Sequence, residues 1–431
     1  MLKKFGKLDN ALSCTHCGFC LPVCPTYRAE NKEIQSPRGR VSAILALRNG
    51  TLTAEEVRRS LSYCLVCRAC HNACPAGVRV GKLVVMARSY AAVVKPWPVR
   101  VFHGITDHDF LSRWASRLVR WYQRSRLRRI VRGGWLGTWH PLVRHVDTLI
   151  PDATAPLEVV SVAPSGEGKP LRAALLCGCM ARMFYPNVAD SVISLLYRLN
   201  VSLDIVQGFG CCGAPHRESG DRVAFLRQAK KVLDGFSPVA GVVDVVVCDT
   251  AVCRITALSY ARALVDDPHY GPLAAKLSEK IVDFSELVLT RWPGRDSFFI
   301  QDTTQRIAFI DHCQTRHGYG IVHQPRRLLA AINGGGIELP RSDQCCGAGG
   351  DLMLSHRGHS ERIRADKLRA IEESGVQVVV GTNAGCLLNV AAGLKTLHSA
   401  VQVVHLGEIL WKSSVYYHDN ALRLQNGCLK E

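Results

Sequence analysis

The sequence predicts a multidomain protein of the α+β and α/β classes, in which a helical N-terminal domain precedes two α/β domains that repeat one another. Three observations predict this organisation. The chain has 431 residues, more than one hydrophobic core usually organises, which indicates two or three domains. Two runs of four closely spaced cysteines occur early in the chain. A sparser cysteine pattern then occurs twice in the rest of the chain, as expected of an internal repeat.

Both early cysteine runs have the spacing C-x2-C-x2-C-x3-C-P, one beginning at Cys14 and the other at Cys64. In this pattern the first three cysteines hold one [4Fe-4S] cluster, and the fourth, next to proline, ligates the neighbouring cluster. The expected ligands are Cys14, Cys17, Cys20 and Cys74 for cluster 1, and Cys64, Cys67, Cys70 and Cys24 for cluster 2. Structural zinc is the alternative, but it normally takes two ligand pairs separated by a longer spacer. The two runs therefore predict two [4Fe-4S] clusters and an electron-transfer function.

The residues between the two runs have helical patterns. AILALRNG and AEEVRRSLSYC predict helices, so we expect residues 1–94 to form a helical ferredoxin-type domain. Ser36-Pro37 is a pattern typical of a helix start. Arg38 and Arg40 follow it, placed either to offset the negative charge of a cluster or on the surface.

Residues 95–165 are rich in arginine and carry much of the net charge of +18. Within DFLSRWASRLVRWYQR, arginines recur at helical spacing beside an apolar stripe, which predicts an amphipathic helix in this linker. The arginines are Arg113, Arg117, Arg120 and Arg124, and the stripe is Phe110, Trp114, Leu118 and Trp121. Such a helix can lie on anionic lipid, dock on an acidic partner, or be a linker helix with a solvated charged face. Nucleic-acid binding is not expected, because no nucleic-acid module accompanies the charge.

An internal repeat follows, at offsets of 134, 134 and 133 residues. ALLCGCMARMFY matches AFIDHCQTRHGY, then CCG matches CCG, and VVVCDTAVC matches VVVGTNAGC. Each cysteine group follows or ends a short apolar run that reads as a strand, and helical patterns such as NVADSVISLLYRL alternate with these runs. Residues 166–300 and 301–431 are therefore predicted to be two pseudo-symmetric α/β domains, which we call the first and second CCG domains.

Four cysteines in each half are candidate metal ligands. They are Cys179, Cys211, Cys212 and Cys253, called the first CCG site, and Cys313, Cys345, Cys346 and Cys386, called the second CCG site. Soft thiolates brought together by strand-end loops favour an iron-sulfur cluster or zinc over a disulfide. Dithiol chemistry at the paired cysteines is the alternative, although adjacent cysteines form a disulfide only with strain. The remaining Cys177, Cys248 and Cys428 lack a counterpart in the repeat and are interpreted as packing residues.

No catalytic residue and no flavin or nicotinamide site is identified, since the glycine clusters lack G-x-G-x-x-G spacing after a strand. His216 and His312 lie beside CCG-site cysteines and are interpreted as structural, hydrogen-bonded histidines. The N-terminus resembles no export signal, which favours a cytoplasmic protein. The uncharged stretch 375–394 is long enough to cross a membrane, but VQVVVG within it predicts a buried strand followed by a turn and a helix.

The motifs SCTHCGFCLPVCPTY, SPRGR and the two CCG repeats resemble the glycolate oxidase iron-sulfur subunit family over nearly the whole chain. They resemble heterodisulfide reductase subunits more distantly. The first resemblance implies an electron-transfer subunit that is not catalytic alone and that takes electrons from an FAD-containing partner oxidising glycolate, D-lactate or another 2-hydroxy acid. The acceptor it implies is a quinone or other carrier. Peripheral contact of the Arg-rich segment with the inner face of the membrane is a further expectation.

The more distant resemblance implies a different reaction, thiol-disulfide exchange at the CCG sites. In that wider family the CCG motif ends in C-x2-C and holds an unusual iron-sulfur cluster. Here Thr250 and Asn383 replace the first cysteine of that ending. Each half therefore offers four matching thiolates instead of five, which argues against disulfide reduction and leaves electron transfer intact.

Overall fold

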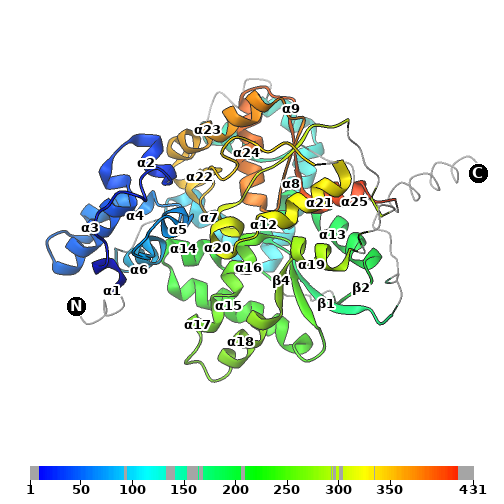
Figure 1. Cartoon of the computed structure of the whole chain (residues 1–431), viewed down its shortest axis with the longest axis horizontal. Coiled ribbons are helices and arrows are strands. Elements are labelled where there is room, and N and C mark those ends of the chain that lie inside the picture. The colour runs from blue at the N-terminus through cyan, green and yellow to red at the C-terminus, as the bar shows by residue number, and fades with distance from the viewer. Residues whose placement is uncertain are drawn as a thin grey trace, which may run out of the picture.

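The computed structural model describes residues 9–91, 95–132, 141–152, 164, 168–204, 209–292, 294, 298–299, 304–333 and 335–415. Mixed helices and parallel sheets form the body, and a helical N-terminal unit lies against one end of it (Figure 1). No helix within the described ranges is long and apolar enough to cross a membrane. The expected strand in 375–394 is confirmed as β6 (Val378–Gly381), and the helix after it as α24 (Ala384–Thr396).

The N-terminal unit is built from short helices around one small core. Its elements are α1 (Asp9–Leu12), α2 (Pro25–Glu30), η2 (Glu33–Gln35), α3 (Pro37–Asn49), α4 (Ala54–Ser62), α5 (Ala69–Asn72) and α6 (Val80–Ala91). The predicted helix start is confirmed, because the Ser36 side chain accepts a hydrogen bond from the Gly39 N–H and Pro37 begins α3. Apolar residues of α3, α4 and α6 pack together, with Ile44, Leu61 and Val84 fully buried. The cysteine loops are thus carried on a packed helical scaffold.

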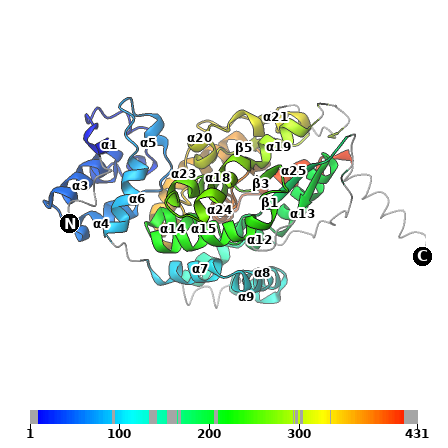
Figure 2. The same ribbon diagram turned by 90° about the horizontal axis from the view of Figure 1, so that it is seen from below.

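The Arg-rich segment forms a layer of helices on the body, which we call the helical layer. Its described helices are α7 (Trp97–Asp107), α8 (Asp109–Arg124), α9 (Arg126–Arg132) and α11 (Pro141–Leu149). Figure 2 shows α7, α8 and α9 along one side of the body. The predicted amphipathic helix is α8. Arg128 and Arg132 of α9 donate to Asp147 of α11, so the layer is tied together by buried charge.

Asp107, at the end of α7, anchors this layer to the first CCG domain. His216 donates from Nε2 to the carboxylate at 2.6 Å and Arg227 donates at 2.9 Å, while Lys231 donates to the Asp107 carbonyl oxygen. Burial alone would raise the pKa of the Asp107 carboxyl. The hydrogen bond from His216 and the charges of His216 and Arg227 outweigh burial and hold that pKa below its usual value.

We expect an Asp107→Asn variant to lose about 2 kcal/mol of unfolding free energy, because charged hydrogen bonds to a buried carboxylate are lost. A carboxyl whose pKa is lowered by folding stabilises the protein above its ordinary pKa of about 3.9, and the contribution disappears as pH falls through the folded value. The full difference in unfolding free energy between wild type and variant should therefore appear at neutral pH. Urea unfolding followed by tryptophan fluorescence measures it. The exposed Asp266→Asn is the matched control; equal stability of the two variants would contradict the anchoring role.

The first α/β half contains a four-stranded parallel sheet in the order β2-β1-β3-β4. Its strands are β1 (Leu171–Leu176), β2 (Val201–Asp204), β3 (Val245–Cys248) and β4 (Ile281–Asp283). Its helices are α12 (Cys179–Phe184), α13 (Pro186–Arg198), α14 (Ala214–Ser219), α15 (Arg222–Phe236), η3 (Ser237–Val239), α16 (Ala251–Ala257), α17 (Tyr260–Ala263), α18 (Tyr270–Lys280) and α19 (Phe284–Arg291). Helices α12 and α16, which follow β1 and β3 in the chain, each carry a predicted ligand.

The second half contains a three-stranded parallel sheet in the order β5-β6-β7. Strands β5 (Ile307–Phe309) and β7 (Gln402–His405) flank β6, and the other helices are α20 (Cys313–Tyr319), α21 (His323–Asn333), α22 (Leu352–Ser355), α23 (Arg357–Ser374) and α25 (Leu406–Lys412). Where the first sheet has β2, this half has an isolated bridge from Ile337 to Ala308. The pseudo-symmetry of the halves and the domain boundaries remain predictions.

One hydrophobic core joins the two α/β halves. It includes Val192 of α13, Phe284 of α19, Val379 of β6 and Leu410 of α25, and α13 packs directly on α25. Because this core is continuous, the cysteine loops of both halves are held in a fixed relation to each other.

Candidate iron-sulfur sites

Two adjoining cavities in the N-terminal unit are lined by the cysteines predicted to hold the clusters. Cys14, Cys17, Cys20 and Cys74 line the first cavity, together with Cys70. Cys24, Cys64, Cys67 and Cys70 line the second. Apart from Cys70 in the first cavity, the grouping follows the ligand exchange expected of the C-P pattern, with three cysteines from one run and a fourth from the other. Cys70 lines both cavities, so the two sites adjoin.

The two cysteine loops share an unusual backbone conformation. His16 and Gly18 have φ of 57° and 89°, and the residues at the same positions of the second run, Val66 and Arg68, have φ of 52° and 67°. Left-handed backbone is costly for residues other than glycine, above all for a β-branched valine. Such strain persists where surrounding structure imposes it, typically at ligand clamps. The loops are therefore shaped to point several sulfurs at one volume.

Burial raises the pKa of the Cys20 and Cys70 thiols, and raises that of Cys67 to about 12. A coordinated metal overcomes such a penalty because it deprotonates its thiol ligands. Two arginines lie beside the cavities. Arg38 lines the first and donates to the His16 carbonyl oxygen, while the buried Arg40 lines the second and donates to Ser60 and Gln35. The donor sets, cavities and positive charge fit iron-sulfur clusters, which are anionic when held by four thiolates.

The first CCG site is a continuous group of buried sulfurs. All four thiols are buried, and Cys179 interacts electrostatically with Cys211, Cys211 with Cys212, and Cys212 with Cys253. These interactions with Cys211 and Cys253 lower the pKa of Cys212 to about 6. The Tyr260 hydroxyl donates to the Cys212 carbonyl oxygen at 2.6 Å. All four predicted cysteines are thus brought together, from α12, the CCG turn and α16.

In the second CCG site, Cys346 donates through its thiol to Cys386 at 2.7 Å. Hydrogen bonding to Cys346 raises the pKa of Cys345, and Cys313 begins α20 beside this group. The amide of Asn389 donates to the Cys346 carbonyl oxygen at 2.7 Å. The four predicted cysteines therefore lie in one region, at the edge where β5 and β6 end.

The glycine after each cysteine pair is required by its backbone. Gly213 and Gly347 have φ of 79° and 75°, a region that glycine adopts without steric cost. Each donates its N–H to the sulfur two residues earlier, Cys211 or Cys345, at 3.4 Å. The two CCG turns are therefore built alike, and both direct a backbone N–H toward a thiol.

Thr250 and Asn383, which stand where related motifs have cysteine, lie at the sites without adding a thiolate. The Thr250 hydroxyl is buried among the described residues without a hydrogen-bond partner. The Asn383 amide donates to the Cys386 sulfur at 3.6 Å. The Asn383 side chain therefore acts directly on a thiol, whereas Thr250 meets one through its backbone carbonyl oxygen, which accepts from Cys248 at 3.3 Å.

The structure adds one sulfur that the sequence interpretation set aside. Cys248 is fully buried, donates through its thiol to the Thr250 carbonyl oxygen at 3.3 Å and interacts electrostatically with Cys253, so it lies beside the first CCG site and is more than a packing residue. In the second half its counterpart is Gly381, and a Cβ there would lie 2.6 Å from Nε2 of His312. The His312 ring occupies that space, which explains why the second half has no fifth sulfur. Cys177 packs against the core, and Cys428 lies outside the described residues.

Both histidines set aside in the sequence analysis are hydrogen-bonded, as predicted. His216 pairs with Asp107, as described above. His312 accepts hydrogen bonds through Nε2 from the backbone N–H groups of Thr382 and Asn383. It therefore holds the loop that leads into Cys386.

The second cavity of the N-terminal unit borders the second CCG site. Cys67 and Leu65 form one apolar cluster with Leu352 and Ile363, against which Cys313 and Cys345 pack. A Cβ on Gly349, three residues after Cys346, would lie 2.7 Å from the Leu65 side chain. Nothing in the sequence indicated this contact, because Cys67 and Cys345 are far apart in the chain.

The first CCG domain also contacts the junction between the N-terminal unit and the second CCG site. The α16 helix, which carries Cys253, packs against α20, which begins at Cys313. Arg88 of α6 donates to the carbonyl oxygens of Leu61, Ser62 and Cys64, and across the junction to that of Glu218. The loop that carries Cys64 and Cys67 is thus tied to both halves of the body.

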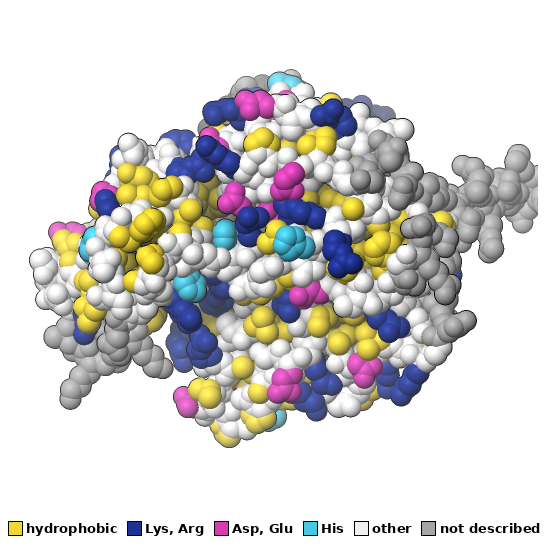
Figure 3. Space-filling view, in the orientation of Figure 1, with side chains coloured by type: hydrophobic (Ala, Val, Ile, Leu, Met, Phe, Trp, Pro, Cys, Tyr) yellow, Lys and Arg dark blue, Asp and Glu magenta, His cyan; other side chains and the backbone are white. Residues whose placement is uncertain are grey.

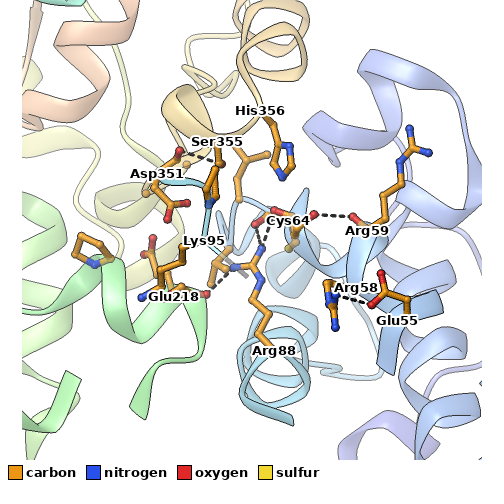
Figure 4. A pocket seen from close by; sticks show the side chains of 18 residues that line it. Glu55, Arg58, Arg59, Cys64, Arg88, Lys95, Glu218, Asp351, Ser355 and His356 are labelled. Atoms are coloured by element: carbon orange, nitrogen blue, oxygen red, sulfur yellow. Dashed lines mark hydrogen bonds and ion pairs between the residues drawn. The ribbon is translucent and has the colours of Figure 1, made fainter. Parts of the chain in front are cut away.

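A cavity of about 260 Å³ lies at this junction (Figure 4). Cys64 lines it from the N-terminal unit, Glu218 from α14, and Gly349, Gly350 and Asp351 from the segment after the second CCG turn. Burial raises the pKa of both the Glu218 and Asp351 carboxyls. Figure 4 shows these two side chains on the same side of the cavity as Lys95. A small molecule here would reach the peptide segment that carries Cys64.

Basic side chains gather on the surface near this junction. Burial and the positive charges of Arg262, Arg79, Arg68 and Arg217 lower the pKa of Lys82. Figure 3 shows Lys and Arg side chains grouped where the N-terminal unit meets the body. This surface is suited to an acidic partner and to offsetting the charge of anionic clusters.

The fold and its cysteine sites define an iron-sulfur protein. Residues 10–78 match the 4Fe-4S dicluster domain, and residues 173–256 and 307–391 match the Cysteine-rich domain. The chain is 31% identical to the probable glycolate oxidase iron-sulfur subunit of Bacillus subtilis over 94% of each chain. It is 26% identical to the glycolate oxidase iron-sulfur subunit of Escherichia coli, covering 91% of this chain and 93% of that one.

Lactate utilization protein A of Bacillus subtilis is also similar, with 27% identity over 56% of this chain and 99% of the relative. The chain belongs to the glycolate oxidase iron-sulfur subunit family, which confirms the resemblance inferred from the sequence.

Proposed function

We propose that this protein is the iron-sulfur electron-transfer subunit of a flavin-dependent 2-hydroxy-acid dehydrogenase complex. The observation that carries the proposal is the adjacency of the sites. Cys70 lines both N-terminal cavities, and Cys67 packs with Cys313 and Cys345 of the second CCG site. Such a row of sulfur groups suits stepwise electron transfer between partners.

In this proposal, Cys14, Cys17, Cys20 and Cys74 hold cluster 1, and Cys64, Cys67, Cys70 and Cys24 hold cluster 2. Bound clusters would supply one-electron carriers. The chain's own residues place these carriers: the strained loops aim the sulfurs, Arg38 and Arg40 offset charge, and Arg88 holds the Cys64 segment against α14.

The two CCG sites would each hold a further iron-sulfur cluster, with zinc as the alternative ligand. Within the described ranges, no group of three or more His, Cys, Asp or Glu side chains is arranged to hold a metal ion. A cluster distributes its cysteine ligands over several irons, so it needs a wider set of sulfurs than a tetrahedral zinc ion does. The linked thiols of the first site, with Cys248 beside them, favour the cluster.

The partners in this proposal are those that the resemblance to the glycolate oxidase iron-sulfur subunit family implies. An FAD-containing subunit would oxidise glycolate, D-lactate or a similar 2-hydroxy acid, and a quinone or another carrier would accept the electrons, with the complex on the cytoplasmic face of the membrane. The basic surface around Lys82, Arg217 and Arg262 is the candidate docking site for an acidic surface of the flavoprotein.

Anaerobic reconstitution tests the proposal. The chain mixed with its flavoprotein subunit and a 2-hydroxy acid should show reduction of its clusters by EPR, and the chain alone should pass no electrons from the acid to a dye. Oxidation of the acid by this chain without flavin would refute the proposal. Reduction of a disulfide by the chain, given low-potential electrons, would favour the thiol-disulfide alternative instead.

A further inference from the structure

The amphipathic helix α8 turns its apolar side to solvent and its small polar residues to the body. Its buried residues are the small Ser112 and Ser116, on the side that contacts α12. The apolar stripe is turned to solvent: Phe110 is 69% exposed, Trp114 56%, Leu118 61% and Trp121 58%. Surface helices normally bury their apolar stripe, but among the described residues nothing covers this one.

Neighbouring helices extend the same surface. Trp97 and Val101 of α7, and Leu127 and Ile130 of α9, are also exposed. All three helices lie in one layer along one side of the body (Figure 2). We call these exposed residues, together with the stripe of α8, the α8 face. Large exposed apolar patches mark sites of protein or membrane interaction.

The charge beside the stripe indicates what covers it. Arg113, Arg117 and Arg124 are exposed, and helical geometry of about 100° per residue places them along one border of the stripe. Asp109 is the one acidic residue of α8. Protein interfaces are also enriched in Trp, Phe and Arg, so the composition of the stripe alone does not choose the partner, and the excess of arginine over acidic residues on α8 does. A helix with arginines beside a stripe of Trp, Phe and Leu is instead typical of peripheral helices on anionic bilayers.

We infer that the α8 face docks on the surface of an anionic lipid bilayer, with its aromatic stripe in the headgroup region and its arginines on lipid phosphates. This inference rests on the proposed function, because docking serves electron transfer to an acceptor in the membrane. Helix α8 packs on α12, which begins at Cys179, and a Cβ on Gly210 would lie 3.0 Å from the Asp109 carboxylate. Docking would therefore hold the first CCG site close to the membrane, where a lipid-soluble acceptor is found.

The helical layer is held to the body by ion pairs on its inner side, so it can dock without separating from the body. Asp107 pairs with His216 and Arg227, and Arg128 and Arg132 pair with Asp147. These contacts use the inward and lateral sides of the helices. The outward stripe takes no part in these ion pairs. Within the stripe, Phe110 and Trp114 form an edge-to-face pair with 6.1 Å between ring centroids.

Co-sedimentation with vesicles tests the inference on the cluster-containing full chain. We expect binding to phosphatidylglycerol–phosphatidylcholine vesicles, weaker binding to phosphatidylcholine alone, and loss of binding in high salt. The Trp114→Gln/Trp121→Gln variant should bind about tenfold more weakly, and Arg113→Gln/Arg117→Gln should lose the preference for anionic vesicles. The control is Val223→Gln/Val265→Gln, which changes two exposed apolar residues outside the helical layer.

Two outcomes would overturn the inference: no binding of the wild type to anionic vesicles, or equal binding of the Trp variant and the control. Weaker binding of the Trp variant to the flavoprotein subunit would also overturn it, since the α8 face would then be a protein interface. Dye reduction by the soluble complex separates this inference from the proposed function. The Trp variant should keep wild-type dye reduction, whereas failure of the wild type in that assay concerns the proposed function alone.

Discussion

A Cys67→Ser variant is expected to stop electron transfer through the chain. Cys67 lines the cluster 2 cavity and also packs toward Cys313 and Cys345, so it lies at the step between the N-terminal unit and the second CCG site. Loss of one thiolate ligand should remove or alter cluster 2, lowering iron by up to about four atoms per chain. Hydroxy-acid-driven reduction of the terminal acceptor, assayed with the flavoprotein, should fall to background.

The control for this variant is Cys177→Ser, because Cys177 lines neither cavity of the N-terminal unit. It should keep full iron content and full electron transfer. Circular dichroism of both variants would show whether the fold is retained. If Cys67→Ser kept the cluster 2 EPR signal and the wild-type rate, the assignment of Cys67 and the relay through it would be wrong.

An Arg88→Met variant should give the largest loss of stability. Arg88 is buried, burial lowers its pKa, and its guanidinium donates to the carbonyl oxygens of Leu61, Ser62, Cys64 and Glu218. Removing the guanidinium leaves several buried carbonyl groups without a donor, at a cost of about 3 kcal/mol or more. Urea unfolding of the anaerobic protein should show the loss, and the cluster 2 EPR signal should broaden because the Cys64 segment is no longer held.

Arg100→Met provides the comparison, since Arg100 is exposed on α7. We expect it to change stability by less than about 0.5 kcal/mol. Similar unfolding curves for the two arginine variants would show that Arg88 does not join the N-terminal unit to the body.

Local patterns predicted much of the fold and most of the site. The C-P spacing predicted which cysteines meet, and the cavities group Cys74 with the first run and Cys24 with the second. The run VQVVVG predicted β6, and Ser36-Pro37 predicted the start of α3. The strand and the helix start are confirmed because periodicity and capping depend on residues close together in the chain; the ligand assignments remain predictions.

Features that depend on distant residues were not predicted. The contact of Cys67 with Cys345, the bonds of Arg88 across the junction and the anchoring of α7 by Asp107 each join segments far apart in the chain. Cys248 was set aside because the repeat gives it no counterpart, yet the His312 ring beside Gly381 accounts for that difference. The outward direction of the α8 stripe likewise could not be predicted from the sequence, because periodicity defines an apolar face of a helix without defining what that face contacts.

The most direct test of the account is iron and acid-labile sulfide per chain on anaerobically purified protein, with EPR of the reduced sample, for the wild type and for Cys211→Ser and Cys345→Ser. We predict about twelve to sixteen irons in the wild type and a clear decrease in each variant, because both CCG sites would carry clusters. About eight irons, unchanged in both variants, would contradict the account, since the relay would then be confined to the N-terminal unit.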